Sequence, residues 1–225
     1  MLRIGIDTGG TFTDLFWMEA GRHGSCKVLS TPEDPSRAVL SGLRALLGGR
    51  LPAAPGKPTP AGPGEREMAL PPGSAVVHGT TVATNALLEG RGAPVALLAT
   101  AGFEDLLEIG RQDRPSLYDP SVMPAPPLVP RRCRYGIPGR LGPDGQEESP
   151  LDLESVEEAV RAALTAGSRG IAICFLHAYA HPGHEEEAAR IVSRLGGDAT
   201  LSSRVLPEYR EYERTSTTVV SAALK

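Results

Sequence analysis

Residues 4–14 read IGIDTGGTFTD and say more about the fold than any other stretch of the chain. An apolar run ends at Ile6, the motif Asp7-Thr8-Gly9-Gly10 interrupts it, and a β-branched and aromatic run resumes at Thr11. This pattern predicts two strands, at 2–6 and 11–18, joined by a glycine-rich turn.

The turn has the composition of a phosphate-binding loop. Two glycines let the backbone approach a ligand closely, and successive N–H groups and threonine hydroxyls form a nest for phosphate oxygens. Asp7, at the end of a strand, is placed to hold Mg²⁺ through water. The loop is neither GxxxxGK[ST] nor GxGxxG, since both patterns are absent. The alternative is a hairpin in which Asp7 and the glycines only make the turn.

Composition narrows the class of protein. A chain of 225 residues with 40% hydrophobic residues, 22% charged residues and a net charge of −4 fits one large or two small globular domains. No basic run exists and aromatics are 4%, so nucleic acid is not an expected partner.

The three cysteines are too far apart in sequence for a metal knuckle or redox pair. With no signal peptide and no apolar stretch of about 20 residues, a cytoplasmic location without membrane contact is expected.

Alternating strand and helix patterns follow. A strand at 28–30 precedes a helix from Pro35 to Gly48, and 49–73 forms a solvated insert rich in proline and glycine. Expected strands at 75–77 and 94–99 alternate with helices at 81–88 and 103–109, which favours an α/β domain with a partly parallel sheet.

The second half continues this alternation. The sequence predicts a proline-rich loop at 119–130, a hairpin at 134–148 that turns at Pro143-Asp144-Gly145, and a helix capped by Asp152 that runs to Ala166. A buried strand at 170–176 and helices at 185–195 and from Pro207 onward follow. The tail at 217–224 becomes apolar without a glycine cap, so we expect it to pack against a partner outside the chain.

The string at 4–14 resembles the first phosphate motif of the actin, sugar-kinase and heat-shock-chaperone ATPase superfamily. The form is that of the hydantoinase A, 5-oxoprolinase and acetone carboxylase family. Further blocks resemble this family in its order: HGTTVATNALLE at 78–89, TAGFEDLLEIGRQDRPSLYD at 100–119, PLVP at 127–130, CFLHAY at 174–179 and SSRVLPEYREYERTSTTVV at 202–220. The chain departs from the family in the insert at 49–73 and at Gly139, where an acidic residue is expected.

The resemblance implies an α/β fold, lobe I of an actin-like (ribonuclease H-like) ATPase, with a mixed sheet and flanking helices. Residues 1–205 would form the N-terminal lobe, and 206–225 would begin the next domain and lead to an absent lobe II. The implied enzyme is an ATP-dependent hydrolase of cyclic amides that uses ATP and Mg²⁺ to phosphorylate the amide carbonyl oxygen, with a second, hydantoinase B-type subunit; the fragment alone would be inactive. Alternatives are the ATP-binding subunit of an acetone-type carboxylase and a non-catalytic actin-like module.

Site residues follow from the same resemblance. Asp7 would orient Mg²⁺ and, with Thr11, serve catalysis. Nucleotide phosphates would be held by Thr8, Gly9, Gly10 and Thr11, with Thr13 and Asp14 as weaker candidates. Substrate contacts would come from His78, Gly79, Thr80, Thr81, Asn85, Arg111 and Asp113. Without the resemblance, His78 would be interpreted as a buried, hydrogen-bonded histidine, and the charged cluster at 111–114 as a solvated face.

A second cluster permits a metal interpretation. His177, His181, His184 and Glu185 offer enough ligands for zinc. Pro182 interrupts their spacing, however, and His184 with Glu185 fits the first turn of a helix. The structural interpretation is therefore favoured.

Overall fold

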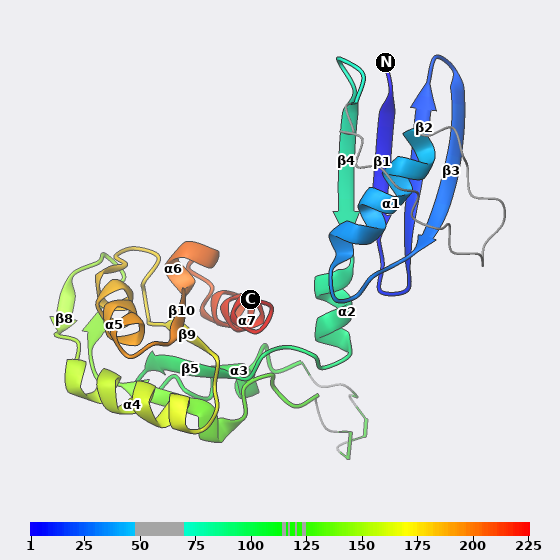
Figure 1. Cartoon of the computed structure of the whole chain (residues 1–225). Helices are drawn as coiled ribbons and strands as arrows, with labels where there is room; N and C mark the ends of the chain where they lie inside the picture. The colour runs from blue at the N-terminus through cyan, green and yellow to red at the C-terminus, as the bar shows by residue number, and fades with distance from the viewer. Residues whose placement is uncertain (48–69, 114–115, 117, 120, 123–124) are drawn as a thin grey trace. The chain divides into compact units, whose positions relative to one another are not determined.

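The computed structural model describes residues 1–47, 70–113, 116, 118–119, 121–122 and 125–225. The chain divides into two compact units, residues 1–90 and 91–225, and each has a four-stranded sheet of its own (Figure 1). Residues 49–69 of the predicted insert at 49–73 lie outside the described residues. The domain boundary expected after residue 205 stays a prediction.

The first unit is a mixed sheet in the order β3-β2-β1-β4. Its strands are β1 (Arg3–Thr8), β2 (Phe12–Glu19), β3 (Arg22–Leu29) and β4 (Ala75–Thr80), and its helices are α1 (Pro35–Leu47) and α2 (Val82–Leu88). β1 pairs antiparallel with β2 and parallel with β4. One face of the sheet packs against α1 (Figure 1), where the alternating side chains of Ile4, Ile6 and Leu15 share a core with Leu43.

The third strand is longer than predicted. It begins at Arg22 because Ala20 and Gly21 close a two-residue turn in which both φ angles are positive, 48° and 79°. Such turns match the twist of an antiparallel pair and keep the two strands in register over their whole length. The pattern at 28–30 therefore predicted only the end of β3.

The second unit contains an all-parallel sheet in the order β10-β9-β5-β6. The strands are β5 (Val95–Thr100), β6 (Arg134–Ile137), β9 (Gly170–Cys174) and β10 (Asp198–Leu201). The longer helices are α4 (Leu153–Thr165), α5 (Gly183–Arg194) and α7 (Glu211–Ala223). Short elements complete the unit: α3 (Leu106–Ile109), η1 (Arg131–Cys133), β7 (Arg140–Leu141), β8 (Glu147–Ser149) and α6 (Ser202–Val205).

Helices cover both faces of this parallel sheet. On one face, α4 and α5 pack against alternate residues of β5 and β9, including Leu98 and Ile173. On the other face, α7 packs against the intervening residues, including Leu97 and Ala172. Both central strands are buried on two sides, and they accordingly read as continuous apolar runs.

Three expectations for the second unit were wrong in detail. Residues 134–137 do not form a hairpin arm but pair parallel with β5, so the hairpin is only the short β7–β8 pair around the predicted turn. β10 was missed because its four residues directly follow a glycine pair and carry little pattern. The helix expected at 103–109 spans only Leu106–Ile109.

The apolar tail of the last helix has a partner inside the chain. Val219, Ala222 and Ala223 are buried against β5 and β9. The expectation that this tail needs a partner outside the chain was therefore wrong. Among the residues that the structure describes, no helix combines the length and the apolar character that crossing a membrane requires.

The three thiols are free and differ in exposure, which makes them probes of the core. Cys26 and Cys174 are buried and Cys133 is partly exposed. Burial raises the pKa of both Cys26 and Cys174, so little reactive thiolate forms there. We expect iodoacetamide to label only Cys133 in the native protein, as mapped by peptide mass spectrometry, and all three cysteines in urea. Native labelling of Cys174 as fast as that of Cys133 would contradict this packing.

Candidate functional site

The turn between β1 and β2 is shaped by close approach of the backbone. Gly9 N donates to Phe12 O over 2.9 Å, and neither glycine of the turn has a positive φ. A Cβ on Gly9 would lie 3.1 Å from Phe12 O, and one on Gly10 would lie 3.3 Å from Asn85 Nδ2. Close neighbours and not φ thus disfavour a larger residue at these two positions, most at Gly9, where the neighbour is backbone. The amides of Gly10 and Thr11 make no hydrogen bond within the described residues, so both can serve a ligand.

Asp7 lies on the face of the sheet that α1 does not cover. Its register partners are Asp14 on β2 and Gly79 on β4. Lys27 forms an ion pair with Asp14, with 2.7 Å between Nζ and Oδ2. Asp7 is exposed, and within the described part of the chain its carboxylate forms no ion pair or hydrogen bond. Its carboxylate is therefore available, whereas that of Asp14 is already neutralised.

Thr8 and Thr13 point to the opposite face, as the two-residue period of a strand requires. Thr8 is 1% exposed, and its Oγ1 lies 2.9 Å from His78 Nε2. Thr13 is fully buried, with Oγ1 3.0 Å from Ser30 Oγ. Both hydroxyls are thus engaged inside the unit. Thr8 and His78 connect the two sequence blocks, and Thr13 braces the turn.

The structure brings the HGTT block against the glycine turn. β4 ends at Thr80 and α2 begins at Val82, so the block lies between a strand end and a helix start, as predicted. Thr81 N donates to Thr8 O over 3.0 Å, and Thr80 Oγ1 donates to the same carbonyl over 3.3 Å. Asn85 Nδ2, which contacts Thr81 Oγ1 at 3.5 Å, lies beside Gly10. Two segments about 70 residues apart therefore form one polar site.

Ser30 also belongs to this site, and the sequence did not predict it. It follows β3 directly and contacts three residues of the turn region: Gly9, Thr11 and Thr13. A lone serine after a strand gives no signal in one sequence. Only the pairing of β2 with β3 places it there.

The remaining substrate candidates lie in the second unit. Arg111 and Asp113 line a pocket of about 530 Å³ together with Tyr212, residues of α3 and residues 125–127. Arg111 Nε lies 2.8 Å from Glu213 Oε1, and its guanidinium stacks on the Tyr212 ring at 5.7 Å. Gln112 has a φ of 59°, an unfavourable conformation for a residue with a side chain. The ion pair thus fixes Arg111 at the wall of the pocket, next to the strained backbone of Gln112.

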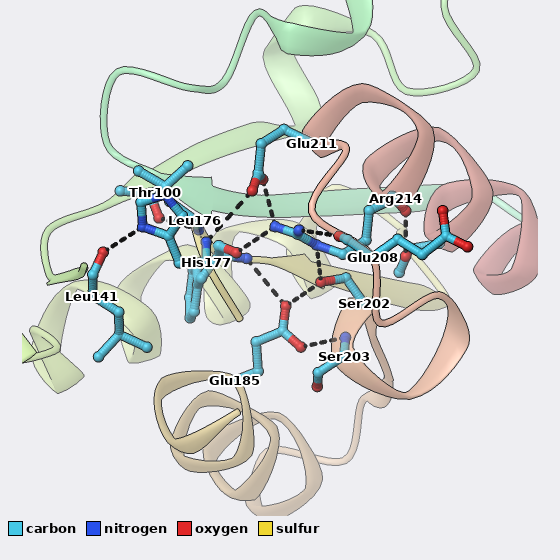
Figure 2. A network of polar contacts seen from close by, with 12 residues as sticks. Thr100, Leu141, Leu176, His177, Glu185, Ser202, Ser203, Glu208, Glu211 and Arg214 are labelled. Atoms are coloured by element: carbon cyan, nitrogen blue, oxygen red, sulfur yellow. Dashed lines mark hydrogen bonds and ion pairs between the residues drawn. The ribbon is translucent and has the colours of Figure 1, made fainter. Parts of the chain in front are cut away.

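The histidine cluster is structural within the described residues, which contain no group of three side chains able to hold a metal. Glu185 is fully buried, and its carboxylate accepts hydrogen bonds from Phe175 N, Ser202 Oγ and Ser203 N. Burial raises the pKa of Glu185. Figure 2 shows this carboxylate beneath Arg214, with Ser202 between the two.

His177 is held apart from that carboxylate. Its φ is 60°, and its Nδ1 lies 2.7 Å from Leu141 O on β7 (Figure 2). His181 Nδ1 accepts from Gly183 N over 3.3 Å. The favoured interpretation of this cluster, an ordinary helix start, agrees with these contacts.

Gly139, where the family pattern predicts an acid, occupies a position that excludes side chains. Its φ is 132°, and a Cβ would lie 2.8 Å from Leu151 Cα. An acidic residue would fit only if the segment between β6 and β7 adopted another path. The departure from the pattern is therefore built into the local backbone.

Comparisons with known proteins identify the family of the chain. Residues 3–196 match the family described as the hydantoinase/oxoprolinase N-terminal region. The chain is 38% identical over 229 residues to the caprolactamase subunit alpha of Pseudomonas jessenii, covering 99% of this chain and 31% of that subunit.

Two solved structures are similar as well. The crystal structure of the ATP-dependent caprolactamase from the same organism matches with a TM-score of 0.77 at 36% identity, over 99% of this chain and 31% of that one. A nucleotide-free acetone carboxylase matches with a TM-score of 0.80 at 25% identity, over 98% and 31%. The chain thus spans about a third of the length of these relatives. It has the mixed α/β architecture expected of an actin-like ATPase lobe, and it belongs to the hydantoinase/oxoprolinase family.

Proposed function

We propose that the chain is the phosphate-binding part of an ATP-dependent hydrolase of cyclic amides. The observation that carries the proposal is the joining of the DTGG turn to the HGTT block, with Asp7 exposed and two amides of the turn that no described residue pairs with. The caprolactamase similarity supports a cyclic amide as the substrate class. An amide is a poor site for nucleophilic attack until its oxygen becomes a phosphate leaving group, which ATP supplies.

The residues present fit Mg²⁺ as a partner of the nucleotide. Mg²⁺ usually keeps several waters and takes one or two carboxylates together with phosphate oxygens. The exposed carboxylate of Asp7, for which the described residues provide no partner, could supply one such ligand, and the amides of Gly10 and Thr11 could face the phosphates. When bound, the ion would neutralise charge on the phosphates, and the two amides would orient their oxygens.

The pocket around Arg111 and Asp113 is the proposed subsite for the ring of the substrate. Its volume of about 530 Å³ is within the range of small-molecule sites. Leu107, Ile109 and Pro127 supply apolar walls, and Asp113 supplies a polar group. A cyclic amide presents the same combination of an apolar ring and one polar edge.

A second candidate is the ATP-binding subunit of an acetone-type carboxylase. It is favoured by the structural likeness to acetone carboxylase, whose TM-score of 0.80 is slightly above that of the caprolactamase. The same phosphate site would serve both reactions, because only the activated molecule differs. A second subunit is proposed for either case, since the matching caprolactamase chain is itself one subunit.

The two candidates predict different requirements for ATP hydrolysis. With its second subunit, the full-length protein is expected to release ADP only when caprolactam, 5-oxoproline or hydantoin is added, as followed by a coupled ADP assay. Dependence on acetone plus bicarbonate would instead identify the carboxylase. Binding of ATP without turnover in any of these mixtures would favour the non-catalytic actin-like module.

A further inference from the structure

Ser30 holds both ends of the β1–β2 turn. Its hydroxyl donates to Gly9 O over 2.7 Å, and its backbone N–H donates to Thr11 O over 2.9 Å. Its Oγ also lies 3.0 Å from the buried Oγ1 of Thr13. Ser30 thus contacts the residue before Gly10, the residue after it, and the strand that follows.

These contacts determine the direction of one peptide plane. The Gly9 carbonyl and the Gly10 N–H belong to the same peptide group, and no peptide bond in the described residues is cis. In a trans peptide the C=O and N–H vectors point in opposite directions. By drawing Gly9 O toward itself, Ser30 therefore turns the Gly10 N–H away, to the side where it makes no hydrogen bond within the described residues.

A peptide between two glycines would not hold this direction by itself. Glycine has no Cβ, so rotation of the Gly9–Gly10 plane meets little steric resistance. The neighbouring side chain of Asn85 does not fix the Gly9–Gly10 peptide plane. Its Nδ2 lies near Gly10 but bonds to Thr81 Oγ1 and not to the Gly10 backbone. The hydroxyl of Ser30 is the contact that fastens the Gly9 carbonyl in the part of the chain that the structure describes.

We propose that Ser30 is a positioning residue, which holds the Gly10 N–H in the direction that binds a phosphate oxygen of the nucleotide. The proposal rests on the proposed function, and it adds a residue that itself does not touch the ligand. Preorganised amides bind anions more tightly because no reorganisation is needed on binding. Loss of the hydroxyl should therefore weaken ATP binding while the chain stays folded.

The test is Ser30→Ala in the full-length protein with its second subunit. One neutral hydrogen bond contributes at most about 1.5 kcal/mol, so KM for ATP and Kd for ATP should rise up to about ten-fold. KM for the cyclic amide should stay unchanged, because none of the described residues that line the proposed ring subsite contacts Ser30. Ser30→Thr keeps the hydroxyl and should restore binding. Ser25→Ala makes the same change at an exposed position of β3 and should match wild type.

The outcomes separate the two proposals. Wild-type protein that does not bind ATP would refute the proposed function and this inference together. Wild-type binding with an unchanged ATP KM in Ser30→Ala would refute only the role of Ser30, and a lowered melting temperature with unchanged KM would show a purely structural role. If Ser30→Ala does not fold, Thr13→Val removes the hydroxyl that supports Ser30 Oγ. That variant should raise KM for ATP in the same direction by a smaller factor, and an unchanged KM would overturn the inference.

Discussion

Asp7→Asn is expected to lower kcat/KM of lactam-dependent ATP hydrolysis by about a thousand-fold, while leaving the melting temperature unchanged. The substitution keeps the shape of the side chain and removes its charge. Removing a single preorganised group that stabilises charge in a transition state reduces rates by about 10²- to 10³-fold, and the loss of an ion's carboxylate should reach the upper end. The free energy of unfolding should not change, because Asp7 is exposed and its carboxylate has no hydrogen bond or ion pair with the described residues.

Two measurements make this prediction specific. Raising Mg²⁺ should recover part of the activity of Asp7→Asn, since the variant loses affinity for the ion. Glu33→Gln neutralises another exposed carboxylate of the first unit and should retain wild-type turnover. Turnover by Asp7→Asn within a few-fold of wild type would remove Asp7 from the site. The turn would then be an ordinary hairpin.

Arg214→Met is expected to destabilise the second unit by about 3–5 kcal/mol, the usual cost of breaking a buried charged network by removing one partner. Arg214 is fully buried, and each nitrogen of its guanidinium donates a hydrogen bond (Figure 2). It donates to the carbonyls of Phe175 and Glu208 and to Ser202 Oγ, and it pairs with Glu211. Methionine fills a similar volume but leaves these acceptors without donors.

The loss should depend on pH because of Glu185, which Ser202 connects to the guanidinium. Burial already raises the pKa of Glu185, so folding favours its protonated form. The stability that protonated Glu185 contributes is fully present below the pKa of the group in the unfolded chain. It is lost as pH rises through the raised pKa of the group in the folded chain. Without the nearby positive charge the pKa of Glu185 should rise further. The loss in free energy of unfolding caused by Arg214→Met should therefore be smaller at pH 5 than at pH 8.

Urea unfolding of the chain, followed by circular dichroism at both pH values, measures this deficit. Arg190→Met removes a guanidinium that is 73% exposed and should change the unfolding free energy by less than about 0.5 kcal/mol. A loss at Arg214 as small as that would show that the network contributes little to folding.

The sequence predicted the parts of the site that local pattern controls. The strand, turn and strand around Gly9 follow from alternation and glycine spacing, and the strand-to-helix position of the HGTT block follows from the next pattern along the chain. The same period of two also implies that Asp7 and Thr8 point to opposite faces. Asp7, assigned to Mg²⁺, and Thr8, assigned to phosphate, therefore have side chains on opposite faces, and that of Thr8 is buried.

Other features depend on pairings between distant segments. The contact of Thr8 with His78 spans 70 residues, and that of Ser30 with Gly9 spans 21. β6 was assigned to a hairpin because a turn motif lies nearby, yet its register partner is β5, and strand pairing of this kind leaves no mark in either strand. Long-range register is therefore visible only in the folded structure.

The position of α7 in the chain has a consequence for biosynthesis. One face of β5 and β9 is covered by residues 219–223, which a ribosome adds some 45 residues after β9 is complete. Until then Leu97, Ala99 and Ala172 remain open on that side. The emerging polypeptide thus presents an apolar sheet surface to chaperones for several seconds at ordinary translation rates. Shortened products that end before Glu211 should accumulate as aggregates.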